Sequence, residues 1–202
     1  MEGRRADPER FQKQLDFILE IDKEKNILRQ THLTGHGRRE NDAEHAWHMA
    51  IMAWLLKEYS NQEIDIARTM MMILIHDIVE IDAGDTYAYD EELLKTQEER
   101  ERRAAERIYG LLPEEQGREL RELFDEFEAC ETPEAKFART MDNFQPLLLN
   151  HDNGGTDWVE HQVRRSQIEK RNEKTMKGSV FIREYLQTII EQHVASGEII
   201  DE

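Results

Sequence analysis

Hydrophobic side chains recur every three or four residues along most of the chain, which is the period of an α-helix. The pattern begins after Asp7-Pro8, a pair typical of an N-cap followed by proline at the first helical position. We expect this first helix to run to about Leu28 and a loop to follow from Gln30 to about Asn41. The apolar positions that define the helix are Phe11, Leu15, Ile18 and Leu19.

Two capping patterns mark the next helices. Asn41 with Glu44 resembles a capping box and opens a second helix, and Ser60 with Glu63 opens a third near Asn61. The third helix continues to Gly84 and is apolar on most faces, which predicts that it lies at the centre of a bundle. The buried stripe expected on the second helix consists of Ala46, Met49, Ala50, Ala53 and Trp54.

The second half of the chain also has a helical pattern. Residues 90–109 predict a highly charged, exposed helix, Pro113 opens a helix ending near Cys130, and Thr132-Pro133 opens one reaching about Leu149. After a turn at residues 153–155, two more helices are divided somewhere within residues 172–178. No segment shows sustained alternation of polar and apolar residues with β-branched enrichment, so we expect an all-α fold, a single domain over residues 1–202 with essentially no sheet.

The charge of the chain limits its partners. The chain has 27 basic and 44 acidic residues, a formal net charge of −17. Such a surface repels nucleic-acid backbones, so we expect no nucleic-acid partner. A small anionic substrate would need a local positive centre, which a bound metal ion and a few arginines could supply.

Composition also indicates where the protein works. With Cys130 as the lone cysteine, no intrachain disulfide can form, which is typical of a reducing compartment. The first eight residues lack the apolar region of a signal peptide, and the longest wholly apolar run, Met70 to Ile75, is far too short for a membrane span. We therefore expect a cytoplasmic protein with no membrane partner.

The candidate chemistry starts with His76-Asp77 inside the most hydrophobic helix. An ionised aspartate there is costly unless it is compensated, and a cation bound by imidazole and carboxylate would compensate it. The alternative is a salt-bridged or capping Asp77 beside a hydrogen-bonded core histidine. The pair is not isolated, however, because Glu80 lies one helical turn on and Asp85 follows the helix end. His45 lies in the first turn of the second helix, and Asp142 lies on another apolar helix.

The order His45, then His76-Asp77, then Asp142 resembles that of the HD-domain phosphohydrolases, which are named after the adjacent pair. The segments 39–45, 76–85 and 136–147 resemble the motifs of the 5'-deoxynucleotidase branch, so the motif core would span about residues 29–150, with helices at 156–196 packed on it. The resemblance implies an HD-domain helical bundle. Where that branch often has an aromatic residue just after Arg29, this chain has Gln30-Thr31-His32-Leu33.

The resemblance also implies roles for individual residues. His45, His76, Asp77 and Asp142 would bind one divalent metal ion, which could be Mn, Co, Zn, Fe or Mg. Glu80 would position or deprotonate the attacking water, and Asp85 would support the water or the nucleotide. Arg29 would contact the phosphate or the sugar. Family members are often homodimers, which makes a homodimer the expected assembly.

The expected activity is hydrolysis of a nucleoside 5'-monophosphate, preferentially a deoxynucleotide, to nucleoside and phosphate. One alternative is hydrolysis of an alarmone, although those enzymes resemble HD-x-x-E-D and here Ile81 follows Glu80. Another is cleavage of a phosphodiester. A non-catalytic module that keeps a structural metal is the third, and it would need neither Glu80 nor Asp85.

Several other residues have simpler interpretations. His48 lies three residues after His45 and is expected to pack near the metal site or support a ligand. Trp47, Trp54 and Trp158 are expected in the core or in dimer packing, and His161 and His193 in solvent. The sequence has no P-loop and no Gly-x-Ser-x-Gly elbow, so it gives no support for a nucleotide-triphosphate motor or a serine hydrolase.

Overall fold

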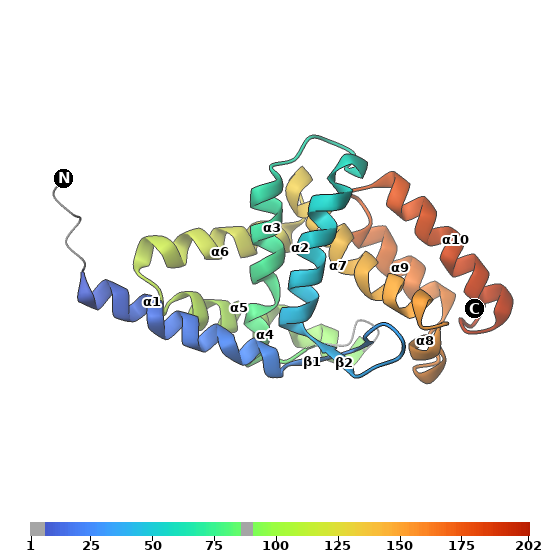
Figure 1. Cartoon of the computed structure of the whole chain (residues 1–202), viewed down its shortest axis with the longest axis horizontal. Coiled ribbons are helices and arrows are strands. Elements are labelled where there is room, and N and C mark those ends of the chain that lie inside the picture. The colour runs from blue at the N-terminus through green and yellow to red at the C-terminus, as the bar shows by residue number, and fades with distance from the viewer. Residues whose placement is uncertain (1–6, 86–90) are drawn as a thin grey trace.

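A computed structural model of the chain describes residues 7–85 and 91–202 (Figure 1). Helix α1 (Pro8–Ile21) begins as the sequence predicts, with the Asp7 side chain accepting hydrogen bonds from the amides of Glu9 and Arg10. It ends before Leu28, because the chain tightens into a 3-10 turn at Asp22–Asn26 and then becomes extended. The prediction of a helix up to Leu28 was therefore wrong in its last turns.

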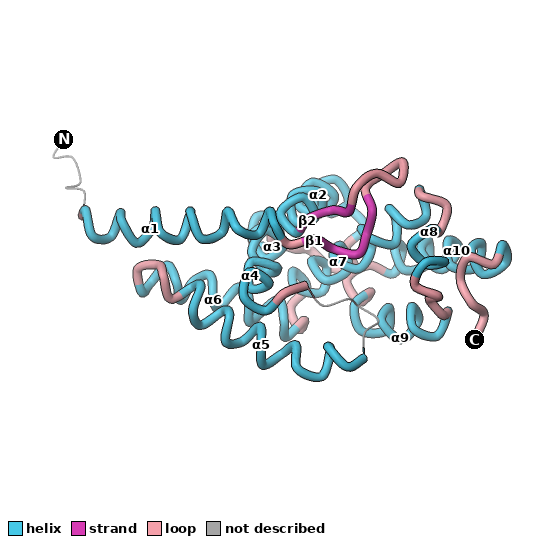
Figure 2. Tube along the Cα trace, turned by 90° about the horizontal axis from the view of Figure 1, so that it is seen from below, coloured by secondary structure: helices cyan, strands magenta, loops and turns pink. Residues whose placement is uncertain are grey.

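A small antiparallel hairpin occupies most of the segment expected to be a loop. Strand β1 (Leu28–His32) pairs with β2 (Arg39–Asn41), with Leu28 opposite Asn41 and His32 opposite Arg39. The strands are short and mostly polar, so they lack the alternation that identifies a strand in the sequence. The hairpin lies beside α2 and α7 (Figure 2) and is the single sheet in the described ranges, which confirms the all-α class.

Helices α2 (Asp42–Leu56) and α3 (Ile66–Ile75) run side by side at the centre of the molecule (Figure 1). The capping box of Asn41 and Glu44 is confirmed, because both of its hydrogen bonds are present. The box expected at Ser60 is not the start of α3, since Asp65 caps that helix instead. A 3-10 turn (His76–Val79) and the short α4 (Glu80–Ala83) replace the predicted continuous helix, so His76 and Asp77 lie where the α-helix ends.

The remaining helices follow in sequence order, and α7 forms the centre of the second half (Figure 1). The helix predicted at residues 90–109 was expected to be exposed, but one of its faces is buried and carries Ala104, Ala105, Ile108 and Tyr109. Its expected start at Asp90 lies outside the described residues. His193 is buried rather than solvated, with His151 and Trp158 against it. The helices are α5 (Glu91–Tyr109), α6 (Glu114–Ala129), α7 (Pro133–Asp152), α8 (Thr156–Glu160), α9 (Arg165–Thr175) and α10 (Val180–Ser196).

Small residues on α2 allow it to pack closely against α3. Ala46, Ala50 and Ala53 are buried together with Met49 and Met52. Trp54, which the sequence places in this stripe, is instead 52% exposed, because the bulky residues of α2 lie on its other face. In the described ranges, no helix has both the length and the apolarity needed to cross a bilayer.

Candidate metal centre

His45 is oriented by a chain of buried polar groups. It lies in the first turn of α2, fully buried, with its Nδ1 3.0 Å from Oε1 of Gln145 on α7. The amide nitrogen of Gln145 donates in turn to Oε1 of Glu40, at 2.7 Å. Because the Gln145 oxygen can only accept, Nδ1 of His45 carries the proton and Nε2 keeps a free lone pair. That nitrogen lies 3.2 Å from Oδ1 of Asp142.

The orientation of the His76 ring is fixed by a hydrogen bond to the backbone. Its Nδ1 donates to the carbonyl of Ile73 at 2.8 Å, so in the neutral ring that a metal ion binds, Nε2 is again the nitrogen with a lone pair. Nε2 is buried and makes no hydrogen bond with any described residue, although it lies 3.0 Å from Oδ1 of Asp77 and 3.7 Å from Oδ1 of Asp142. An orphaned imidazole nitrogen facing two carboxylates is the environment that a metal ion satisfies.

The two aspartates reach this point from different elements. Asp142 lies in the middle of α7, and one of its oxygens comes within 4.8 Å of ligand nitrogens of both histidines. Burial alone would raise the pKa of Asp142, but its contacts with His45 and His76 lower it well below the usual range. Asp77 contacts His76 through one oxygen, and its other oxygen accepts from Arg29 at 2.8 Å. The structure therefore brings together the four side chains that the sequence pattern singled out.

The donor set fits one divalent ion. It consists of two imidazole nitrogens with their lone pairs directed inward and two carboxylates that remain ionised, which is a common ligand combination for first-row metals. His45, His76 and Asp142 each offer one ligand atom, and these atoms lie within 4.8 Å of one another. The cluster is able to hold a divalent metal ion, and Asp77 is adjacent to complete its coordination.

A second carboxylate group lies beside this cluster. Asp42, Glu80 and Asp85 place one oxygen each within 4.8 Å of one another, and Arg29 donates to Asp42 at 3.1 Å. Burial raises the pKa of Glu80 to about 12, with the charges of Asp77 and Asp42 adding to the effect. Burial also raises the pKa of Asp42 to about 7. The site therefore contains more buried negative charge than Arg29 can neutralise, which favours bound cations.

The cluster opens on a cavity of about 730 Å³ whose walls carry several arginines. Arg139 lies over the ring of Phe127, 4.0 Å from its centroid, with Nη1 3.8 Å from Oδ2 of Asp142. Arg171 approaches the same oxygen to 4.0 Å from α9. The cavity is large enough for a small organic ligand, and its arginines suit an anionic one. His76, Asp77, Glu80, Asp85, Arg29 and Asp142 all line it.

Sequence reasoning missed several residues of this site. Arg139 and Gln145 lie three residues before and after Asp142, on the same face of α7, so helical spacing could have identified both. Asp42 was recognised only as part of a motif, and Arg171 lies on a helix that no motif covers. Their positions near the site follow from how α7 packs against β1 and α9, and local sequence spacing does not contain that information.

The pKa shifts predict how stability depends on pH in the metal-free protein. Burial raises the pKa of Glu24 to about 8 and that of Glu101 to about 7, far above their values in an unfolded chain. The folded protein therefore binds more protons than the unfolded one between pH 5 and 8, so the free energy of unfolding decreases as pH rises. The raised pKa values of His45 and His76 act in the same direction, since their contribution is lost as pH rises.

We expect the melting temperature in chelator to fall by several degrees between pH 5.5 and pH 8, because each 1 kcal/mol corresponds to about 2–4 °C. Thermal denaturation followed by circular dichroism would measure it. Glu24→Gln should flatten the slope, and Glu9→Gln, on the exposed side of α1, serves as the control. A melting temperature that stays level or rises over this interval would show that the buried carboxyls are ionised without metal.

Comparisons with known proteins identify the family of the chain. The human 5'-deoxynucleotidase HDDC2 is 32% identical over 111 residues, 55% of this chain and 53% of that protein, so the chain spans about half the length of such curated relatives. The Dictyostelium discoideum protein of that name is 30% identical over 132 residues, 62% of this chain and 70% of that protein. A crystal structure described as a predicted metal-dependent phosphohydrolase from Magnetospirillum magnetotacticum MS-1 is 47% identical, with a TM-score of 0.89, over 94% of this chain and 95% of that chain. The sequence model of the HD domain matches residues 21–182, and the chain therefore belongs to the HD-domain family.

Proposed function

We propose that this protein hydrolyses nucleoside 5'-monophosphates, with a preference for deoxynucleotides, to nucleoside and phosphate. The observation that carries the proposal is the orphaned Nε2 of His76, which faces Asp77 and Asp142 at the wall of an arginine-lined cavity. The names of the curated relatives, which are 5'-deoxynucleotidases, support the substrate class.

In this proposal His45, His76, Asp77 and Asp142 hold the metal, which supplies charge stabilisation to the phosphoryl group when it is bound. Glu80 is 6% exposed, and its Oε2 contacts no hydrogen-bond partner among the described residues. Burial keeps Glu80 protonated in the metal-free protein. A cation bound beside it would displace that proton, and the ionised carboxylate would then position the attacking water and accept its proton. Asp85, in the same carboxylate group, orients that water or the nucleotide. The reaction consumes one water, and its proton leaves with the nucleoside 5'-hydroxyl.

The arginines divide into two groups by their contacts. Arg29 is held between Asp42 and Asp77, so it fixes the orientation of Asp77, and its position on the cavity wall suits a contact with the phosphate or sugar. Arg139 pairs with Glu128 and lies 3.8 Å from Oδ2 of Asp142. Arg171 donates to Oδ1 of Asn143 at 2.7 Å and lies 4.0 Å from the same Asp142 oxygen. We assign these two to the phosphate oxygens, because they line the cavity next to the metal ligands.

Replacing Glu80 tests the catalytic assignment. Glu80→Gln should lower the rate of phosphate release from deoxynucleoside monophosphates by about 100-fold or more, since general acid–base catalysis contributes that much. Phosphate release with Mn²⁺ or Co²⁺, with and without chelator, is the measurement. Glu98→Gln, an exposed glutamate on the same cavity wall, should retain the full rate.

Asp77→Ala should abolish both metal binding and phosphate release. Full activity in Glu80→Gln would disprove its role, and full activity in Asp77→Ala would disprove the metal site. A metal-loaded wild type that releases no phosphate from any monophosphate would contradict the proposed function. Turnover of an alarmone or of a phosphodiester would then indicate that this compound represents the true substrate class. No turnover of any of these compounds would indicate a non-catalytic module.

Replacing Arg171 tests phosphate recognition. Arg171→Ala should reduce kcat/KM by about 10- to 100-fold, the worth of a hydrogen bond to a charged group. Inhibition by the product nucleoside should be unchanged, because it lacks the phosphate. Arg165→Ala, which removes a half-buried arginine that pairs with Glu169 on the same helix, is the matched control. Equal losses of nucleoside and nucleotide binding would show that Arg171 acts on the shape of the pocket instead.

We also propose that the protein is a homodimer and that α2 forms the interface. It exposes Trp47, Ile51, Trp54 and Leu55, whose exposed fractions are 64%, 44%, 52% and 65%, and the neighbouring α3 exposes Met71 and Leu74. Several large exposed apolar side chains on one helix favour an interaction site, and a second copy would present the same side chains.

Trp54→Glu should convert the dimer to a monomer, measured as molar mass by light scattering during size exclusion. Val159→Glu, at an exposed apolar residue on α8, should leave the mass unchanged. A monomeric wild type would contradict the homodimer. A Trp54→Glu variant that remains dimeric would show that the interface lies elsewhere.

Three further expectations stay predictions. The net charge of −17 supports the absence of a nucleic-acid partner, and the lone Cys130 supports a cytoplasmic location. The identity of the metal ion, among Mn, Co, Zn, Fe and Mg, stays open because histidine and carboxylate ligands bind several of these ions.

A further inference from the structure

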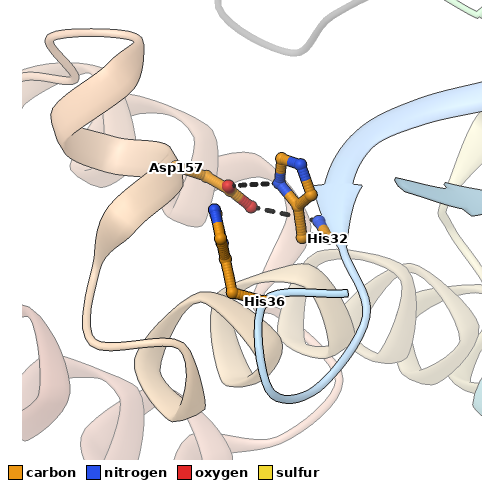
Figure 3. Close-up of side chains that lie close together, drawn as sticks. All are labelled: His32, His36 and Asp157. Atoms are coloured by element: carbon orange, nitrogen blue, oxygen red, sulfur yellow. Dashed lines mark hydrogen bonds and ion pairs between the residues drawn. The ribbon is translucent and has the colours of Figure 1, made fainter. Parts of the chain in front are cut away.

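A second cluster of metal-ligating side chains lies at the end of the β-hairpin (Figure 3). His32 ends β1, His36 lies in the loop that leads to β2, and Asp157 is the second residue of α8. Each offers one ligand atom, and the three atoms lie within 4.8 Å of one another. We propose that this loop cluster binds a divalent transition-metal ion such as Zn²⁺, at a site that shares no residue with the candidate metal centre.

Asp157 gives the loop cluster a buried negative charge. Its side chain is only 5% exposed, and its Oδ2 accepts a hydrogen bond from the backbone amide of His32 at 3.1 Å. Oδ1 lies 2.6 Å from Nδ1 of His32. One oxygen is thus fixed by the backbone while the other faces the two imidazoles, as Figure 3 shows. A buried carboxylate gains more from a nearby cation than from a hydrogen bond alone.

His36 is held toward Asp157 by an unusual backbone conformation. Its φ of 53° lies in the left-handed region, which non-glycine residues seldom adopt. Asn153 maintains this shape, because its Oδ1 accepts from the amide of His36 at 2.8 Å and its Nδ2 donates to the carbonyl of Leu33 at 3.1 Å. The imidazole Nδ1 lies 3.1 Å from Oγ1 of Thr156, which leaves Nε2 for a metal. The loop therefore presents His36 without having to refold.

Only small movements separate this arrangement from tetrahedral coordination. Metal–nitrogen bonds of about 2.0–2.1 Å place tetrahedral ligands roughly 3.3 Å apart. His32 and Asp157 must therefore separate slightly, and the side chain of His36, whose ligand atom already lies within 4.8 Å of theirs, must move closer. The ion takes the place of the Nδ1 proton between His32 and Asp157, and that proton moves to Nε2 of the same ring. Water completes the fourth position, and two imidazoles favour Zn²⁺-class ions over Mg²⁺.

Binding there would join the hairpin to α8. Asp157 lines the cavity next to the candidate metal centre, and β1 also carries Arg29, which contacts Asp77. An ion in the loop cluster would therefore restrain the strand that holds Arg29 in place. Because the ion binds the folded state alone, it would also raise the melting temperature.

The test compares zinc bound per folded chain in the wild type and in His36→Ala, by equilibrium dialysis at low micromolar zinc followed by elemental analysis. His36 is exposed, so the variant should fold, and circular dichroism checks this. We expect His36→Ala to bind one equivalent less than the wild type. Arg38→Ala, which changes the same loop without removing a ligand atom, should bind as the wild type does.

Two further measurements separate this site from the candidate metal centre. Zinc should raise the melting temperature of the wild type by roughly 5 °C more than that of His36→Ala. The double variant Asp142→Asn with His36→Ala should bind one equivalent of zinc less than Asp142→Asn alone, whether or not the protein hydrolyses nucleotides. Equal zinc content in the wild type, His36→Ala and Asp157→Asn would overturn the proposal.

Discussion

The concentration of buried negative charge at the meeting point of α2, α4 and α7 determines the chemistry of this protein. Asp42, Asp77, Glu80 and Asp142 are all buried there, and Arg29 is the cation that contacts two of them. Carboxylates removed from water must be protonated or paired with positive charge. The raised pKa values of Glu80 and Asp42 reflect protonation, and a divalent ion supplies the pairing. A bound cation would therefore stabilise the fold, which links metal binding to stability.

The central helix ends just before these ligands. A 3-10 turn over His76–Val79 follows α3 and leads into α4. Within that turn the Nε2 of His76 lies 3.0 Å from Oδ1 of Asp77. Glu80 begins α4 and Asp85 follows its end, and each places a carboxylate oxygen within 4.8 Å of one of Asp42. An interruption of regular helix of this kind is frequent at functional sites.

Features that depend on local pattern were predicted from the sequence, and those that depend on packing were not. The cap at Asn41 and the helical class follow from spacing and residue chemistry. The closeness of His45, His76, Asp77 and Asp142 was expected from the resemblance to HD-domain phosphohydrolases, because these residues lie far apart along the chain. The hairpin at Leu28–His32 was missed, because its pairing with Arg39–Asn41 leaves no periodic signal. Arg171 was missed because its closeness to Asp142 arises from how α9 lies against α7. Trp54 was placed in the core by helical period, although its large ring belongs to the exposed stripe.

The two histidine clusters differ in how firmly their lone pairs are oriented, and this difference predicts an order of affinity. At the candidate metal centre, Gln145 and the carbonyl of Ile73 hold the Nδ1 protons of His45 and His76, so both Nε2 atoms face inward before any ion arrives. In the loop cluster, Nδ1 of His32 is itself engaged by Asp157, and binding requires its proton to move. His36 is exposed and must also give up freedom of rotation. The loop cluster should therefore bind more weakly and exchange its ion faster, which suits a site that responds to metal supply while the buried centre stays loaded.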